Sequence, residues 1–169
     1  MKKINSNLYF LIFLIFLFLT RLTLTGSIFA CGEEGGIIRL WDICQQSNLS
    51  SIEAHDKFVD SISFSNNGFY FASGSNVENS IKIWDLRKLS LVNEIKLENK
   101  FDLKKIKFDA TGTYIGFSGM KLGVINTKTA EIIVEFDDHK DVVNDFGFAS
   151  GCGFIASASA DKTIKVFSL

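Results

Sequence analysis

Short stretches in which apolar and polar residues alternate cover most of the chain after residue 26. FVDSISF (58–64) and SIKIWDL (80–86) alternate, and FYFASGS (69–75) stands between them. Alternation with a period of two buries one face of a strand. VVNDFGF, FIASASA and TIKVFSL repeat the scheme near the C-terminus, and DLKKIKF, TYIGFSG and KLGVIN form a middle copy. We predict an all-β fold with three strands in a first partial repeat, then four, four and three.

A period of about 42 residues organises these strands. Trp-Asp dipeptides at 41–42 and 84–85 lie 43 residues apart, and His139 follows His55 by 84 residues, or twice 42. Self-similarity at about 40–45 residues with a closing Trp-Asp is typical of WD40 propeller blades. The sequence therefore predicts a partial β-propeller, an open arc of three to four four-stranded blades.

The repeat boundaries follow from this period. We assign residues 26–169 to the repeats, as 26–53 (partial), 54–97, 98–136 and 137–169. By this count the first repeat lacks its innermost strand and the last lacks its outermost one. A propeller protects its sheet edges by closing into a ring, so we expect an arc of this size to leave two faces uncovered.

Residues 1–25 are predicted to be a separate hydrophobic segment, with the run LYFLIFLIFLFL at 8–19. We expect this run to be helical. Twelve helical residues rise about 18 Å, short of the roughly 30 Å hydrocarbon core of a membrane. Lys2 and Lys3 before a short apolar run fit a secretory signal. A wrongly assigned gene start would also produce such an apolar run, because codons for Phe, Leu and Ile share a central U. The abrupt start of the repeat favours this second interpretation.

The composition excludes several classes of function. The 18 basic and 19 acidic residues give a net charge of −1, whereas an electrostatic binder of nucleic acid would carry a basic excess. Three cysteines without a Cys-X-X-Cys motif do not indicate a disulfide framework, and His55 with Cys31 or Cys44 matches no zinc spacing. We therefore expect no cofactor, no metal and no direct nucleic-acid binding.

The last repeat carries the residue types of a polar chain that ties WD40 blades together. In such blades a His before the innermost strand bonds a Ser or Thr and an Asp, and the hydroxyl meets the indole N–H of the Trp. The last repeat supplies His139, Ser157 and Asp161, but Phe167 replaces the Trp. These are also the residue types of a catalytic triad. We favour the structural role and predict no catalytic residue, because no exposed nucleophile turn is evident.

The second repeat carries the same chain with one ambiguity. His55, Ser73 and Trp84 stand at the expected positions. The turn that follows is one residue longer, so either Glu78 or Asn79 stands where the Asp is expected. Each of these polar groups has a partner, and burial is tolerable for that reason.

The first and third repeats depart further from this pattern. The first has Trp41, but Cys31 and Gly35 take the Ser and Asp positions. The third has none of the four residues. We interpret the cysteine as a buried structural residue.

The loops that carry the histidines predict a partner surface. In this architecture the third and fifth positions after each His, and the residue before the turn Asp, point toward partners. The candidates are Phe58, Asp60, Val142, Asn144 and Ala160. Two roles stay open for Phe58, because an exposed aromatic is enriched at interface hot spots, whereas a strand-starting Phe packs inward.

From Gly26 to Leu169 the chain resembles the C-terminal WD40 domain of the pre-mRNA-processing factor 19 family. The similarity is carried by GSIFACGEEGGIIRLWDI, SISFSNNGFYFASGS, SIKIWDLRKL, FDATGTYIGFSG and GFIASASADKTIKVFSL. Members are nuclear spliceosome subunits and ubiquitin ligases with a U-box, a coiled coil and a seven-bladed propeller that binds partners. No U-box or heptad region is found in this sequence.

The resemblance implies a protein-interaction scaffold that acts in pre-mRNA splicing in the nucleus. Its partners would be subunits of spliceosomal or ubiquitination complexes, and the chain by itself would not be an enzyme. One alternative is a fragment of a U-box ubiquitin ligase whose catalytic domain is missing here. Another is an exported or membrane-tethered WD40 fragment in the secretory pathway, if residues 8–19 are genuine.

Overall fold

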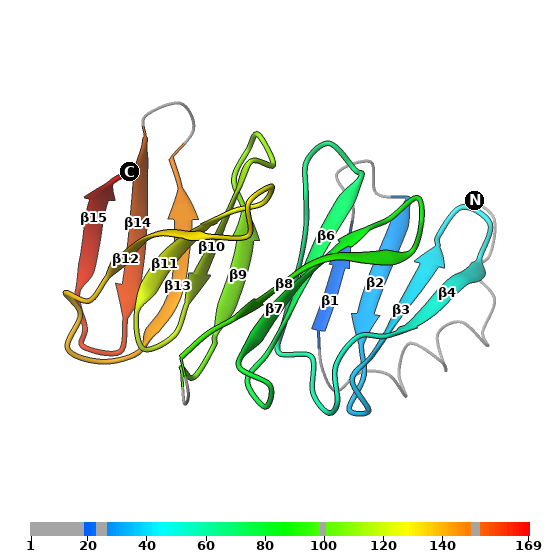
Figure 1. The fold of residues 1–169 in the computed structure, drawn as a ribbon, viewed down its shortest axis with the longest axis horizontal. Helices are drawn as coiled ribbons and strands as arrows, with labels where there is room; N and C mark the ends of the chain where they lie inside the picture. The colour runs from blue at the N-terminus through cyan, green and yellow to red at the C-terminus, as the bar shows by residue number, and fades with distance from the viewer. Residues whose placement is uncertain (1–18, 23–26, 99–100, 150–152) are drawn as a thin grey trace, which may run out of the picture.

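The computed structural model describes residues 19–22, 27–98, 101–149 and 153–169. These residues form fifteen strands in four antiparallel sheets, and the described part contains no helix. The sheets follow one another along the chain and stand side by side in an open arc, with β4 at one end and β15 at the other (Figure 1). The all-β fold and the partial propeller predicted from the sequence are confirmed, and we number the sheets as blades 1 to 4.

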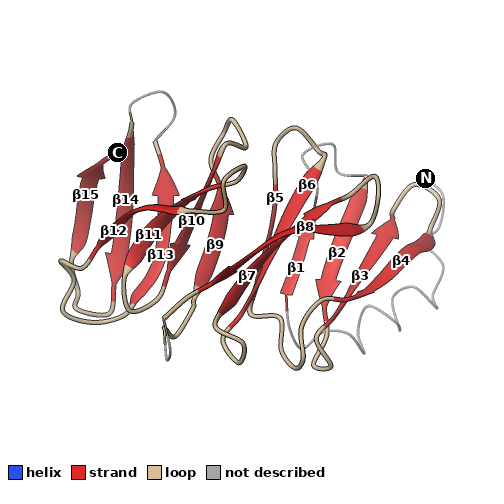
Figure 2. Ribbon diagram, viewed as in Figure 1, coloured by secondary structure: helices blue, strands red, loops and turns tan. Residues whose placement is uncertain are grey.

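Each blade is a meander whose strands pair in chain order (Figure 2). Blade 1 consists of β1 (Leu19–Leu22), β2 (Ile28–Gly32), β3 (Ile37–Asp42) and β4 (Ser47–Glu53). Blade 2 consists of β5 (Ser61–Phe64), β6 (Tyr70–Ser75), β7 (Ser80–Asp85) and β8 (Ser90–Lys96). Blade 3 consists of β9 (Lys105–Phe108), β10 (Tyr114–Ser118), β11 (Leu122–Asn126) and β12 (Ile132–Phe136). Blade 4 consists of β13 (Val143–Phe148), β14 (Phe154–Ser159) and β15 (Ile164–Ser168).

The predicted strand count is right for blades 2, 3 and 4 and wrong for blade 1. Residues 19–22, which the sequence assigned to the N-terminal segment, form β1 and pair antiparallel with β2, Leu19 opposite Gly32. Blade 1 therefore has its innermost strand. The helix expected for residues 8–19 lies outside the described residues, except for Leu19, which is in a strand.

Recurrent local features show that the blades are copies of one design. In blades 1, 2 and 3 the register between the third and fourth strands shifts at the Trp position, before Trp41, Trp84 and Ile125. A β-bulge at the same place changes the direction of the side chain at the Trp position in these three blades. Gly68 and Gly112 stand in the turns after the innermost strands with φ of 73° and 74°, a conformation that favours glycine.

The hydrophobic core lies between blades. One cluster joins blade 1 to blade 2, where Leu40 packs with Phe71 and Trp84, and two others join blades 2 to 3 and 3 to 4. Polar contacts add to this between the inner strands, because the amide of Ile106 on β9 donates to Ser61 Oγ on β5 at 2.9 Å. Each blade therefore depends on its neighbours for stability.

Candidate functional site

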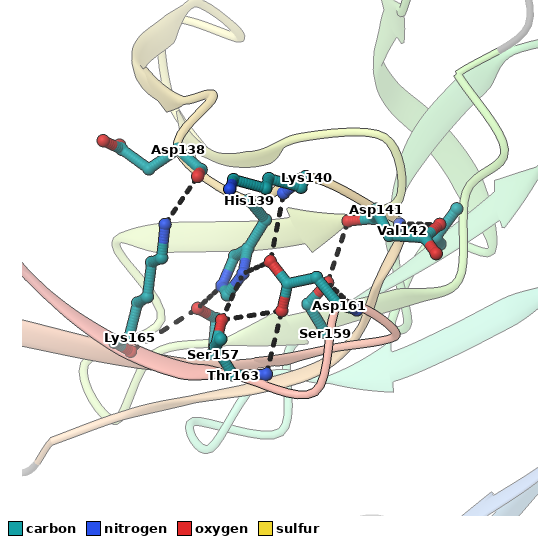
Figure 3. Close-up of polar contacts among 10 residues, drawn as sticks. All are labelled: Asp138, His139, Lys140, Asp141, Val142, Ser157, Ser159, Asp161, Thr163 and Lys165. Carbon is teal, nitrogen blue, oxygen red and sulfur yellow. Dashed lines mark hydrogen bonds and ion pairs between the residues drawn. The ribbon is translucent and has the colours of Figure 1, made fainter.

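The predicted residues of blade 4 come together around His139 (Figure 3). His139 stands in the loop between β12 and β13, Ser157 lies on β14, and Asp161 lies in the turn before β15. His139 Nε2 is 2.8 Å from Ser157 Oγ, and Nδ1 is 2.9 Å from Asp161 Oδ2. The loop is held further because the Lys140 amide donates to Asp161 Oδ2 at 3.0 Å. One carboxylate thus ties the loop before the innermost strand to the turn before β15.

Asp161 is held in its ionised form by this arrangement. The hydroxyl of Thr163 donates to Oδ1 at 2.6 Å and the amide of Thr163 donates at 2.9 Å. Hydrogen bonds from Thr163, and then from His139 and the Lys140 amide, outweigh desolvation and hold the pKa of Asp161 well below its usual range. The turn Asp161–Thr163 is therefore stabilised by its own carboxylate.

Blade 2 contains the complete polar chain. His55 Nε2 is 2.8 Å from Ser73 Oγ, and Trp84 Nε1 donates to the same oxygen at 2.9 Å. His55 Nδ1 lies 3.1 Å from Glu78 Oε2. All donors and acceptors match when His55 is neutral, with Nδ1–H donating to Glu78 and the Ser73 hydroxyl donating to Nε2. Burial lowers the pKa of His55, which favours this neutral form, although Glu78 acts in the opposite direction.

The structure resolves the choice between Glu78 and Asn79. Glu78 takes the carboxylate position, where it also accepts hydrogen bonds from the Asp56 amide and from Ser80 Oγ. Lys82 Nζ lies 2.8 Å from Glu78 Oε2. Burial raises the pKa of Glu78, but the hydrogen bonds from Lys82, Asp56 and His55 outweigh it and bring the pKa down to about 2.

Asn79 has a different structural role, in the turn between β6 and β7. It adopts a left-handed conformation with φ of 49°, which supplies the additional residue of the longer turn. Its side-chain oxygen accepts the amide of Phe101 at 3.3 Å, so it links blade 2 to the loop before blade 3.

Blade 1 lacks the polar chain. Cys31 lies opposite Arg39 in the position that Ser73 holds opposite Lys82. It is fully buried, and burial, with the charge of Glu33, raises the pKa of its thiol to about 11. Its Sγ contacts the Gly32 carbonyl at 3.8 Å. Cys31 is thus a neutral, inert thiol.

Two further residues of blade 1 were predicted by position. Trp41 is half-buried on β3 opposite Phe29, and Gly35 stands in the turn between β2 and β3.

Blade 3 replaces the polar chain with aromatic packing. Phe117 and Ile125 occupy the positions of Ser73 and Trp84, and the ring of Phe101 lies 5.3 Å from that of Phe117. Gly123 makes room for this ring, because a Cβ there would lie 2.2 Å from Phe117 Cζ. Blade 3 therefore buries apolar groups where blade 2 pairs polar ones.

In blade 4 the Trp position is also apolar. Phe167 stacks on Phe136 at a centroid distance of 4.3 Å and meets His139 edge-on at 6.4 Å. Ser157 is 2% exposed and lies within a strand. A nucleophile needs access to a substrate, so this geometry suits a blade support and not a triad.

The predicted partner residues occupy two regions, one in blade 2 and one in blade 4, at the end of the sheets that carries the histidines. Phe58 is half-buried in the loop before β5, and Val142 is half-buried before β13. Asn144 and Ala160 are exposed, and the Ala160 amide donates to the Val142 carbonyl at 2.9 Å. Phe58 and Val142 lie in the loops that the two histidines support, whereas Asn144 lies on β13 and Ala160 in the turn before β15.

Asp60 is half-buried among these loops. Its Oδ2 accepts the Asn76 amide at 2.6 Å, which fixes the turn between β6 and β7. Burial raises the pKa of its carboxyl, and the Asn76 hydrogen bond opposes this rise. Asp60 therefore has a structural contact that its sequence position alone did not reveal.

A cleft between blades 3 and 4 lies at the other end of the sheets. Its volume is about 740 Å³, and Tyr114, Val124, Ile133 and Phe148 line it. None of the predicted partner residues borders it. Among the described residues no group of three or more His, Cys, Asp or Glu side chains is placed to hold a metal ion. No helix in that part of the chain is long and apolar enough to cross a membrane.

Comparison with known proteins identifies these repeats. The family described as WD domain, G-beta repeat, matches residues 46–85 and 130–168. The chain carries WD40 repeats. It is also homologous to pre-mRNA-processing factor 19 over about 85% of its length.

Named relatives show how far this homology extends. Pre-mRNA-processing factor 19 homolog 2 of Arabidopsis thaliana is 28% identical over 152 residues, or 85% of this chain. Pre-mRNA-processing factor 19 of Homo sapiens is 33% identical over 144 residues, again 85% of the chain. The chain spans only 28% of the length of each of these relatives. Small ribosomal subunit protein RACK1z of Arabidopsis thaliana is 34% identical over 80 residues, 47% of this chain and 24% of that protein.

Proposed function

We propose that this WD40 domain is a protein-interaction scaffold of a protein similar to pre-mRNA-processing factor 19 and that it acts in pre-mRNA splicing in the nucleus. The homology over 85% of the chain carries the proposal. The names of these relatives concern mRNA processing, and they lend no support to the exported alternative for residues 8–19. The described residues are blade strands and their loops, so we propose no chemistry of their own.

The polar chains explain how such a scaffold presents a surface. His55 and His139 each fix the loop before an innermost strand through two side-chain contacts. A loop held in one conformation loses little entropy when a partner binds. Phe58 and Val142, which stand on these two loops, are proposed contact residues, together with Asp60, Asn144 on β13 and Ala160 in the turn before β15.

The proposed partners are protein subunits of spliceosomal complexes, and the test is sedimentation of the tagged chain in nuclear extract. We expect the chain to be nuclear and to co-sediment with spliceosomal particles after nuclease treatment. Phe58→Ala is expected to reduce co-sedimentation without lowering the melting temperature, whereas the matched variant Phe69→Ala, at an exposed turn after β5, is expected to retain it. A chain that is absent from these particles, or a Phe58→Ala variant that only loses stability, would contradict the proposal.

A further inference from the structure

The turn between β7 and β8 ends at an exposed serine that follows two basic residues. The sequence there is Arg87-Lys88-Leu89-Ser90, and Ser90 is the first residue of β8. All residues from 87 to 92 are exposed. Blade 2 packs on blade 1 at one face and on blade 3 at the other (Figure 1). Among all serines and threonines of the sequence, only Ser90 has basic residues both two and three positions before it.

The carboxylate of Asp85 shapes this turn and orients the first of the two cations. Its Oδ1 accepts the amides of Arg87 and Lys88 at 2.8 and 3.2 Å, and Arg87 Nη2 donates to Oδ2 at 2.8 Å. The Arg87 side chain is still 54% exposed. The ammonium group of Lys88 forms no ion pair with the residues that the structure describes. Both cations therefore reach solvent close to Ser90.

The hydroxyl of Ser90 is accessible for the same reason. Ser90 stands opposite Asp85 in the last pair of the ladder between β7 and β8, and within the described part of the chain its Oγ has no hydrogen-bond partner. β8 is the outermost strand and pairs with β7 alone. Ser90 and Leu91 can leave β7 without uncovering a buried side chain of their own, because Leu91 is already 46% exposed. The end of an edge strand opens locally at low cost, which allows an enzyme to bind residues 87–91 in an extended form.

We propose that Ser90 is a phosphorylation site for a serine/threonine kinase that selects basic residues before the serine, and that Arg87 then pairs with the phosphate. Acidic residues in the substrate groove of such a kinase bind Arg87 and Lys88, because opposite charges select the partner. Ser90 Oγ forms a bond to the γ-phosphorus of ATP while the bond from that phosphorus to the bridging oxygen of ADP breaks. The hydroxyl proton passes to a base of the kinase.

Phosphorylation reverses the charge of this edge of blade 2. One carboxylate and two basic groups, Asp85, Arg87 and Lys88, carry a net charge of +1, whereas a phosphoserine adds about −1.5 to −2 at pH 7. Hydrogen bonds from Arg87 lower the pKa of Asp85 to about 2, so its carboxylate is ionised. Residues directly opposite each other have Cβ atoms about 4.5–5.5 Å apart, which places the phosphate next to this carboxylate. The two anions compete for Arg87, and the phosphate offers it more charge and more acceptor oxygens.

The test is phosphorylation of the folded full chain by the catalytic subunit of cyclic-AMP-dependent protein kinase with magnesium and ATP, followed by mass spectrometry. We expect one phosphate per chain, located at Ser90, and none in Ser90→Ala. Ser47→Ala is the matched control and should react normally, because Ser47 stands opposite Asp42 in blade 1 without basic residues before it. Lys88→Gln removes no contact within the described residues and should lower kcat/KM by about tenfold.

Three results would overturn the proposal. The folded chain, checked by circular dichroism, could carry no phosphate at Ser90 while a synthetic peptide of residues 84–94 accepts one, which would show that the turn is closed to the kinase. Phosphate located at another residue, or Lys88→Gln that reacts as fast as wild type, would also contradict the proposed site. Phosphorus NMR tests the role of Arg87, because the second pKa of the phosphate should be lower in wild type than in Arg87→Gln. Equal values would show that Arg87 stays with Asp85.

Discussion

Trp84 and Phe167 hold the same position in blades 2 and 4, but they use it in different ways. Trp84 donates its indole N–H to Ser73 at 2.9 Å, whereas Phe167 stacks on Phe136 at 4.3 Å. The loop of each blade is nevertheless fixed by a His bonded to a Ser and a carboxylate. The His-to-carboxylate contact is therefore common to both blades, and the Trp contact is an addition in blade 2.

The indole hydrogen bond is tested by Trp84→Phe. This change keeps an aromatic ring but leaves Ser73 without its donor, so we expect a loss of about 1–3 kcal/mol in the free energy of unfolding. The matched control is Trp41→Phe, because Cys31 replaces the Ser in blade 1, and its loss should be smaller. Urea unfolding at fixed protein concentration measures both. Equal losses would show that ring size matters and the hydrogen bond does not.

Asp161 is expected to order the loop and the turn of blade 4. Asp161→Ala removes the acceptor of the Lys140 and Thr163 amides, and we expect these amides to exchange with solvent faster. Stability should fall as well, because these donors lose their acceptor. Asp138→Ala is the control in the same loop, because Asp138 bonds Lys165 through its backbone carbonyl and not its side chain. Unchanged exchange at Lys140 in Asp161→Ala would refute this role.

Stability should fall as the pH is lowered, in two ranges. Burial lowers the pKa of His55 in the folded state, so the unfolded chain binds a proton first and stability declines below about pH 6.5. The pKa of Glu78 is about 2 in the folded chain, against an ordinary value of 4.5, so its contribution to stability is present above pH 4.5 and is lost toward pH 2.

The two ranges can be separated by substitution. His55→Asn should remove the part of the decline in stability between pH 7.5 and 5.5 that His55 causes. The decline in stability below pH 4.5 should remain. The urea midpoint measured across this pH range provides the readout. A wild-type chain that gains stability between pH 7.5 and 5.5 would show that His55 is charged in the folded state.

The aromatic packing of blade 3 depends on a glycine. Gly123→Ala would place a Cβ 2.2 Å from Phe117 Cζ, and Phe117 is fully buried, so the ring has no free space. We expect a loss of about 1–3 kcal/mol from overpacking. Gly147→Ala is the strand control, because nothing lies within 4 Å of its Cβ, and thermal unfolding should show it nearly neutral. A neutral Gly123→Ala would mean that Phe117 can move.

Much of the fold could be predicted because each repeat shows similar local patterns of apolar and polar residues. The phase of the two His residues predicts the same His-to-Ser and His-to-carboxylate contacts in blades 2 and 4. The spacing of the two Trp-Asp pairs predicts the length of a blade. The strand Leu19–Leu22 was missed because its sequence, LTRL, begins at the end of an apolar run and shows no alternation of apolar and polar residues. Its pairing with β2 depends on a partner elsewhere in the chain, which local patterning does not encode.

The site was predictable in its residue types but not in all its partners. Glu78 and Asn79 were equally placed by sequence, and only the turn geometry shows that the longer Glu side chain reaches His55. The contact between Asp60 and the Asn76 amide joins two segments 16 residues apart. Hydrogen bonds of this kind depend on how distant segments pack together, and the sequence contains no motif that would predict them.

The central claim is that these sheets are successive blades around one axis, and the contact between innermost strands tests it most directly. In the structure the amides of Ile106 and Phe108 donate to Ser61 Oγ and Ser63 Oγ, each across 45 residues of chain. Nuclear Overhauser spectra of the labelled chain should show both amides close to the β-protons of these serines. Absence of these contacts, with Ser61 close to another strand instead, would contradict the propeller arrangement.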